Sequence, residues 1–265
     1  SNRQGAGFWR LMTHHRDVSK LSGVSFTPVC SGDGFAIYDN VRVTIDEGTD
    51  FMGEAPKLAR PVKIDGKPDE WNFAAHPLPL LCVNQITAED GYKWSSENLS
   101  GVAACAWDEK GLYLAAWVRD DIHQPAGAGS LGDSLTIALH PANRREGTEG
   151  QAFQLYLSDV NPGGGSGRYT LYRPAARAGG RKSGQLAKDS SVFEIAIGRS
   201  GDCTTYELFV PWAEVGARPA AGLKLGLSLQ LDDGDGTAAH GRMNWGAGLT
   251  PVWAPSAFGV LTLID

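Results

Sequence analysis

The chain has 265 residues, a formal net charge of −6, 34 glycines and 14 prolines. Its acidic balance argues against nucleic acid or an anionic membrane as a partner, because both attract basic surfaces. No segment approaches the roughly 18 consecutive apolar residues of a membrane span, so we expect no membrane insertion.

The N-terminal 46 residues carry three strand-like runs. The last of them includes the phrase Asp39-Asn-Val-Arg-Val and resembles the closing strand of a jelly-roll domain. Three strands alone cannot bury enough surface to be stable. Residues 1–46 are therefore predicted to be tail strands of a preceding β domain, or accessory strands of the next one, and residues 47–60 a linker. The three runs span residues 8–12, 24–29 and 35–45.

From residue 61 to residue 265 the dominant pattern is apolar and polar alternation with a period of two. Residues 223–231 place five leucines on one face of a strand and put Ser228 and Gln230 on the other. Helix is expected only in short turns, near residues 69–72 and 212–215. Many short alternating strands favour an all-β fold, an antiparallel β-sandwich of the jelly-roll or immunoglobulin-like type. The same alternation occurs in residues 111–119, 133–140, 151–158 and 206–210.

The four cysteines, Cys30, Cys82, Cys105 and Cys203, lack the spacing of a metal site. Cys82 and Cys105 fall in neighbouring predicted strands. Two alternatives stay open for them, a disulfide between the two strands or buried free thiols.

The polar sides of the predicted strands carry amide and hydroxyl groups. Such groups beside aromatic rings suit a sugar, because hydroxyls need planar donors and acceptors while the apolar face of a pyranose stacks on a ring. The alternative is an ordinary solvated sheet face. The polar residues are Thr136, Gln154, Tyr156, Ser228 and Gln230, with Tyr113 and Trp117 on a further strand.

Of the eight tryptophans, six divide into two groups by sequence context. Trp94 and Trp253 lie in polar or proline-rich loops, where a large ring has less structural reason to occur, so they are predicted to stack on a ligand. Tryptophans in or beside strands are predicted to be core. These are Trp71, Trp107, Trp117 and Trp212.

Two acidic clusters follow predicted strands directly, Asp120-Asp121 and the group Asp232, Asp233 and Asp235. Carboxylates in such loops are candidate ligands of a structural Ca²⁺ ion. Aspartates that cap their own backbone are the alternative. No HExxH, GxSxG or P-loop pattern is present, so the chain is predicted to be non-catalytic.

Several motifs, taken in order, resemble the family 9 carbohydrate-binding modules of the DOMON-like group. The resemblance implies a β-sandwich that binds a poly- or oligosaccharide, within a larger, extracytoplasmic, polysaccharide-active protein. Members often carry calcium. The motifs are residues 62–71 (VKIDGKPDEW), 106–121, 132–141, 206–212, 225–235 and 253–263, with Trp245 near the end.

In sugar-binding members two tryptophans sandwich the ligand. Trp253 matches one of them, whereas the other is replaced around Ser130. Gln230 matches a sugar-contacting glutamine. The family's glutamate, arginine and asparagine contacts correspond here to Thr136, Gln154 and Tyr156.

The resemblance leaves two further functions open. A structural spacer without ligand would explain the missing charged contacts. A haem-binding electron-transfer module would need axial ligands, for which Met243 with His240 is the pair to examine.

Overall fold

The computed structural model describes residues 51–89, 91–124, 132–143, 151–157, 167–172, 192–234, 240–249 and 253–265. Residues 49–265 form one compact unit. The strand-like runs predicted in residues 1–46 lie outside the described residues, as does Cys30.

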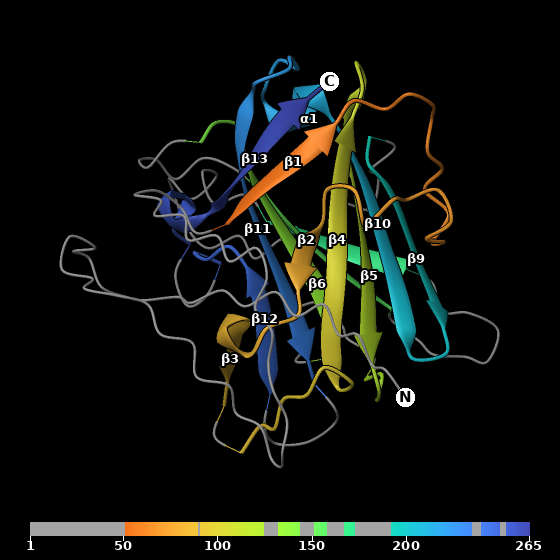
Figure 1. The fold of residues 1–265 in the computed structure, drawn as a ribbon, viewed down its shortest axis with the longest axis vertical. Coiled ribbons are helices and arrows are strands. Elements are labelled where there is room, and N and C mark those ends of the chain that lie inside the picture. The colour runs from red at the N-terminus through yellow and green to blue at the C-terminus, as the bar shows by residue number, and fades with distance from the viewer. Residues whose placement is uncertain are drawn as a thin grey trace, which may run out of the picture. The chain divides into compact units, whose positions relative to one another are not determined.

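Two β-sheets make up the described unit (Figure 1). Every strand pair is antiparallel except β1 with β13, which is parallel. The larger sheet has the order β1 (Met52–Pro56), β13 (Gly259–Ile264), β11 (Lys224–Asp233), β6 (Ser134–His140), β7 (Gln151–Leu157) and β8 (Gly167–Tyr172), with β12 (Gly241–Trp245) pairing β11 and β3 (Ile86–Ala88). The smaller sheet has the order β2 (Leu78–Leu80), β4 (Leu99–Trp107), β5 (Gly111–Asp120), β10 (Cys203–Pro211) and β9 (Glu194–Ser200).

Helix is confined to short segments in the described residues. The helix predicted at residues 212–215 is confirmed as α1 (Trp212–Val215). At the segment predicted near residues 69–72, residues 68–71 form a turn instead, in which the Trp71 N–H donates to the Pro68 carbonyl. Two 3-10 helices, Val83–Gln85 and Pro255–Ala257, complete the list. None of these helices has the length and apolar character needed to span a bilayer.

The core lies between the two sheets and follows the predicted alternation. The leucines of β11 from Leu225 to Leu231 are all buried there, together with the inward side chains of β6, β5 and β10. The β-sandwich prediction is therefore confirmed. The inward residues of those other strands are Leu135, Ile137, Leu139, Leu112, Leu114, Tyr206, Leu208 and Val210.

Part of the predicted linker at residues 47–60 is a strand. β1 pairs with β13 and places Ala55 in the core, so these residues belong to the sandwich. Gly53 contributed to the linker prediction. Close packing requires a glycine there, because a Cβ at this position would lie 2.3 Å from Leu78 Cδ2.

The structure decides between the disulfide and the free thiols that the sequence left open for Cys82 and Cys105. Cys82, Cys105 and Cys203 are free thiols, so no disulfide joins Cys82 to Cys105. Cys105 is buried, and burial raises the pKa of its thiol well above the usual range. The thiol behaves as a small apolar group in the core.

A segment that we call the strap (residues 65–71) packs against the outer face of the smaller sheet. Glu207 of β10 points away from the core and is fully buried. Its Oε2 accepts the Asp65 and Gly66 backbone N–H groups at 2.8 and 2.5 Å, and its Oε1 accepts the Trp71 indole N–H at 2.7 Å. One carboxylate thus fixes both ends of the strap.

Close approach of the strap to β9 depends on glycine. A Cβ on Gly198 would lie 2.2 Å from the Gly66 carbonyl oxygen, and Gly66 itself has a φ of +81°.

Burial raises the pKa of Glu207, and the three N–H donors act in the opposite direction. The motif at residues 62–71 therefore has a structural role, because three of its N–H groups donate hydrogen bonds to the buried Glu207.

Candidate functional site

A row of polar residues crosses the outer face of the larger sheet. Gln230 pairs with Asn244 on one side and with Thr136 on the other. Thr136 pairs with Gln154, and Gln154 with Thr170. Cross-strand partners share a sheet face, and the neighbouring leucines of β11 face the core. We call these residues the polar row: Asn244, Gln230, Thr136, Gln154 and Thr170.

For some residues of the polar row the structure defines the side chain, and for others it defines only the backbone. Gln230 is 4% exposed and its amide Nε2 donates to Asp232 Oδ1 at 3.0 Å. Thr136 is half-buried. Gln154 and Tyr156 are placed by the backbone of β7 alone, two positions apart and hence on one face. The register prediction that Thr136, Gln154 and Gln230 come together is therefore supported by strand pairing.

Trp253 borders the polar row. It packs with Leu249 against a small cluster of Ala138, Ala152 and Phe258, separate from the main core. Its ring makes an edge-to-face contact with Phe258, with centroids 5.2 Å apart and an interplanar angle of 86°. Ala138 stands two positions from Thr136 on β6, so the half-buried indole lies beside the row.

The loop that carries Trp253 is closed by a glycine. The Ala254 N–H donates to the Gly248 carbonyl at 2.8 Å. Gly248 has a φ of +83°, and a Cβ there would lie 2.2 Å from the Ala254 carbonyl oxygen. A larger residue at this position would displace the loop and its tryptophan.

The other tryptophans divide differently from the sequence prediction. Trp107 and Trp212 are core, as predicted. Trp117 is 43% exposed and faces outward on β5, so its predicted core position is wrong. Trp94 packs against the main core and its indole N–H donates to the Leu99 carbonyl at 2.7 Å, a structural role away from the Trp253 cluster. Trp71, also predicted to be core, is instead half-buried in the strap, where its indole N–H donates to Glu207.

A charged pair borders the polar row on the side opposite to Trp253. Asp232 Oδ1 accepts Arg242 Nε at 3.0 Å, and Asp232 Oδ2 accepts the Ser134 hydroxyl at 3.0 Å. Burial raises the pKa of Asp232, while the hydrogen bonds and the guanidinium act in the opposite direction. Asp232 is therefore held by three donors from two neighbouring strands and its own.

The predicted calcium ligands are only partly described. Asp235 lies outside the described residues, and Asp233 accepts the Tyr92 hydroxyl. With a guanidinium bound to Asp232, the described part of this group suits an ion pair better than a hard cation, which prefers oxygen ligands alone. Calcium at this loop stays a prediction.

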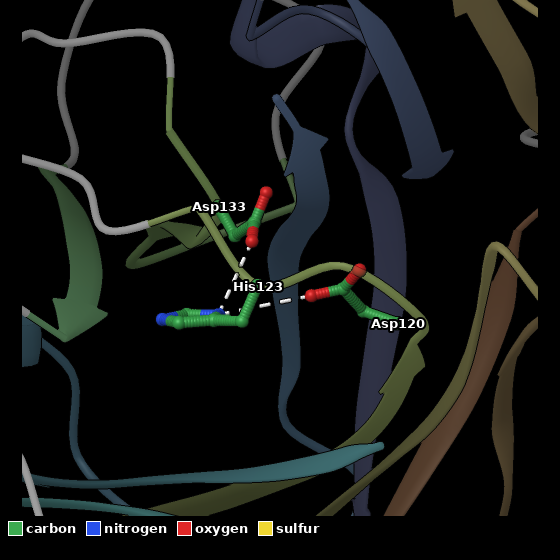
Figure 2. Close-up of side chains that lie close together, drawn as sticks. All are labelled: Asp120, His123 and Asp133. Atoms are coloured by element: carbon green, nitrogen blue, oxygen red, sulfur yellow. Dashed lines mark ion pairs between the residues drawn. The ribbon is translucent and has the colours of Figure 1, made fainter. Parts of the chain in front are cut away.

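The second acidic cluster gathers around a histidine that sequence reasoning did not single out (Figure 2). Asp120 ends β5, His123 follows three residues later, and Asp133 precedes β6. His123 Nδ1 lies 3.1 Å from Asp133 Oδ2 and 3.7 Å from Asp120 Oδ2. All three side chains are about 95% buried. We call this group the buried triad; its only signal in the sequence was a His three residues after an Asp at a strand end.

Arg199 of β9 completes the charge balance of the buried triad. Its Nη1 lies 3.4 Å from Asp120 Oδ2 and its Nη2 donates to the Asp120 carbonyl at 2.8 Å. Burial alone would lower the pKa of His123, but the two carboxylates outweigh it and raise the pKa to about 9. The His123 imidazole and the Arg199 guanidinium thus face two acidic side chains, and burial raises the pKa of one of these, Asp133.

Asp133 of the buried triad holds together the chain after β5, the start of β6 and the end of β11. Asp133 accepts the backbone N–H groups of Gln124 and Gly234 at 2.5 and 2.9 Å, so it ties the connection to the end of β11. Within the described residues it is the only cluster of three or more side chains of metal-ligand type. An imidazole would favour a transition metal over calcium, yet the charges are already balanced, so the arrangement fits an ion-pair cluster.

The pair considered for haem ligation does not offer an open ligand. Met243 is fully buried in the main core on the inner face of β12. His240 precedes that strand, and its backbone carbonyl accepts the Glu89 N–H at 2.9 Å. Packing accounts for the position of Met243.

Comparisons with known proteins agree with this architecture. Residues 64–265 match the family model described as carbohydrate family 9 binding domain-like. No curated protein sequence matches significantly.

Solved structures share the fold at low identity. A family 9 carbohydrate-binding module from Caldicellulosiruptor kristjanssonii in complex with cellotriose has 18% identity and a TM-score of 0.53, over 80% of this chain and 94% of that one. The same kind of module with glucose gives 17% and 0.52, over 79% and 95%. A candidate carbohydrate-binding protein from Bacteroides uniformis gives 11% and 0.51, over 80% and 99%.

Proposed function

This chain belongs to the carbohydrate family 9 binding domain-like family, and on that premise we propose that it binds a poly- or oligosaccharide without transforming it. The observation that carries the proposal is the polar row beside Trp253 on the outward face of the larger sheet. An indole offers a stacking surface to the apolar face of a pyranose, and amides offer donors and acceptors to its hydroxyls.

A binding role without catalysis is supported by where the ionisable groups lie. The buried triad sits inside the protein, where no substrate reaches it. Glu207 is saturated by the strap. Carboxylates placed this way stabilise the fold rather than act on a glycosidic bond.

Glucose-based oligosaccharides are the first ligands to test, because the two Caldicellulosiruptor modules hold cellotriose and glucose. Thr136 and Gln154 stand at positions where sugar-binding members of the family have a glutamate and an arginine. Because these charged contacts are replaced, we expect a modest affinity in the millimolar to micromolar range. We further propose that the chain serves as a targeting module of a larger, extracytoplasmic protein. Structural polysaccharides are found outside the cell, so a module that targets them would act there.

A titration with substituted tryptophans tests the proposal. Cellotriose and a broad glycan screen are applied to the wild-type protein, to Trp253→Ala and to Trp117→Ala as a matched exposed tryptophan. We expect binding to be lost in Trp253→Ala and kept in Trp117→Ala, with both variants folded by circular dichroism. If the wild-type protein binds no glycan of the screen, the structural-spacer function replaces the proposal.

A further inference from the structure

The charged pair Asp232–Arg242 has the position of a second contact on the proposed binding face. The two residues are cross-strand partners on β11 and β12, and Asp232 follows Gln230 by two positions. Both therefore share the outward face with the polar row. The Arg242 side chain is 29% exposed and that of Asp232 19% exposed, so the pair is reachable from solvent.

Arg242 is fixed at one end and open at the other. Its Nε donates to Asp232 Oδ1, an oxygen that also accepts the Gln230 amide. Ser134 holds the other oxygen of the same carboxylate. Among the described residues, no hydrogen bond or ion pair involves the two terminal nitrogens of Arg242. The guanidinium fork is thus oriented with its terminal donors available.

The distance between the charged pair and Trp253 sets a minimum length for a ligand that contacts both. Trp253 packs against the cluster that contains Ala138 of β6, and Asp232 pairs with Ser134, four positions from Ala138 on the same strand. At about 3.3 Å per residue this separation along the strand is roughly 13 Å, already more than the width of one sugar ring, and Arg242 on β12 lies two strands, or about 10 Å, across the sheet from β6. A ligand that touches both Trp253 and Arg242 must be an oligosaccharide.

We infer that Arg242, oriented by Asp232, forms a distal subsite that holds a further sugar unit of the same oligosaccharide through a pair of neighbouring hydroxyl oxygens. This rests on the proposed function, which it makes more specific. A planar fork donates two parallel hydrogen bonds with a geometry that lysine cannot reproduce. Because Asp232 compensates the charge of Arg242, the subsite suits neutral sugars. Arg242 would then set a preference for oligosaccharide over monosaccharide.

Calorimetric titration of wild type and Arg242→Gln with glucose and with cellotriose tests this. We expect Arg242→Gln to weaken cellotriose binding roughly tenfold, the effect of losing charge-assisted hydrogen bonds, and to leave glucose binding within about twofold of wild type. Arg242→Lys should recover only part of the loss. Arg218→Gln, at an exposed arginine after α1, is the matched control and should change neither affinity.

A second variant separates recognition from folding. Asp232→Asn with Arg242→Gln keeps a neutral hydrogen-bonded pair and avoids an unpaired buried carboxylate, so it should fold as wild type and show the same selective loss. Equal weakening for glucose and cellotriose, or unchanged cellotriose binding in a folded Arg242→Gln protein, would overturn the subsite while leaving the proposed function in place. Failure of the wild-type protein to bind either sugar or any glycan of the screen would overturn both.

Discussion

The outward faces of the two sheets carry similar residue types but have different surroundings. On the smaller sheet, Glu207 and its cross-strand partner Ala115 are fully buried, and the strap supplies the partners of the carboxylate. On the larger sheet, the polar row is bordered by the half-buried Trp253 and the partly exposed Arg242. A polar side chain on a strand becomes structural when the chain itself provides its partners, and a candidate for recognition when donors are left to solvent.

The largest effect in this comparison is expected from Glu207→Ala. The substitution leaves two backbone N–H groups and one indole N–H without their acceptor, so we expect the free energy of unfolding to fall by about 3 to 5 kcal/mol. Denaturant unfolding measures it. A loss below about 1 kcal/mol would show that the strap is held by other contacts.

Glu207→Gln is the control for that substitution. A glutamine side chain keeps one carbonyl oxygen but places an amide group against the remaining donors, so an intermediate loss is expected. Sugar binding by either variant should persist wherever the protein remains folded, because the polar row lies on the other sheet.

A smaller effect is expected from the pH dependence of the buried triad. The pKa of His123 in the folded protein is about 9, against about 6.5 in an unfolded chain. Its contribution is therefore complete below pH 6.5 and is lost as the pH rises through 9. At about 1.4 kcal/mol per pKa unit, the free energy of unfolding should fall by roughly 2 to 3 kcal/mol over that range. Urea titrations at several pH values measure it.

His123→Gln provides the matching control. Without the imidazole, the protein should be less stable at pH 6.5 and its stability should change little between pH 6.5 and 9.5. If the wild-type protein showed a flat profile over this range, the ion-pair account of the triad would be incorrect.

The smallest effect is expected from Trp117→Ala. The Trp117 residue is 43% exposed on the outward face of β5, so the substitution should lower the free energy of unfolding by only about 1 kcal/mol. Thermal unfolding measures the change. A loss several times larger would indicate that Trp117 is covered in solution by another part of the protein.

Period-two alternation was enough to predict the sandwich. It located β5, β6, β7, β10 and β11 within a few residues, because inward leucines must face an opposing sheet. It also placed Gln230 and Thr136 on one face. Short strands were harder: β1 carries Gly53 and Pro56, which are typical of linkers, and only its pairing with the final strand reveals it.

The site was predicted less completely because its environment depends on distant segments. The exposure of Trp117 and the packing of Trp94 against the core both depend on which distant segments lie next to them. Arg242 carried no signal of its own, since its partner Asp232 is ten residues away in the chain, on the neighbouring strand. Glu207 similarly meets residues more than 130 positions earlier in the chain.

The pairing of β1 with β13 joins residues more than 200 positions apart, Met52 with Val260. Such a pairing carries a large loop-closure entropy and contributes to slow folding, as non-local sheets generally do. During synthesis on the ribosome, β1 emerges before every other described strand and has to wait for β13 before it gains a partner. The order of translation thus leaves the first strand of the domain unpaired for longer than any other described strand.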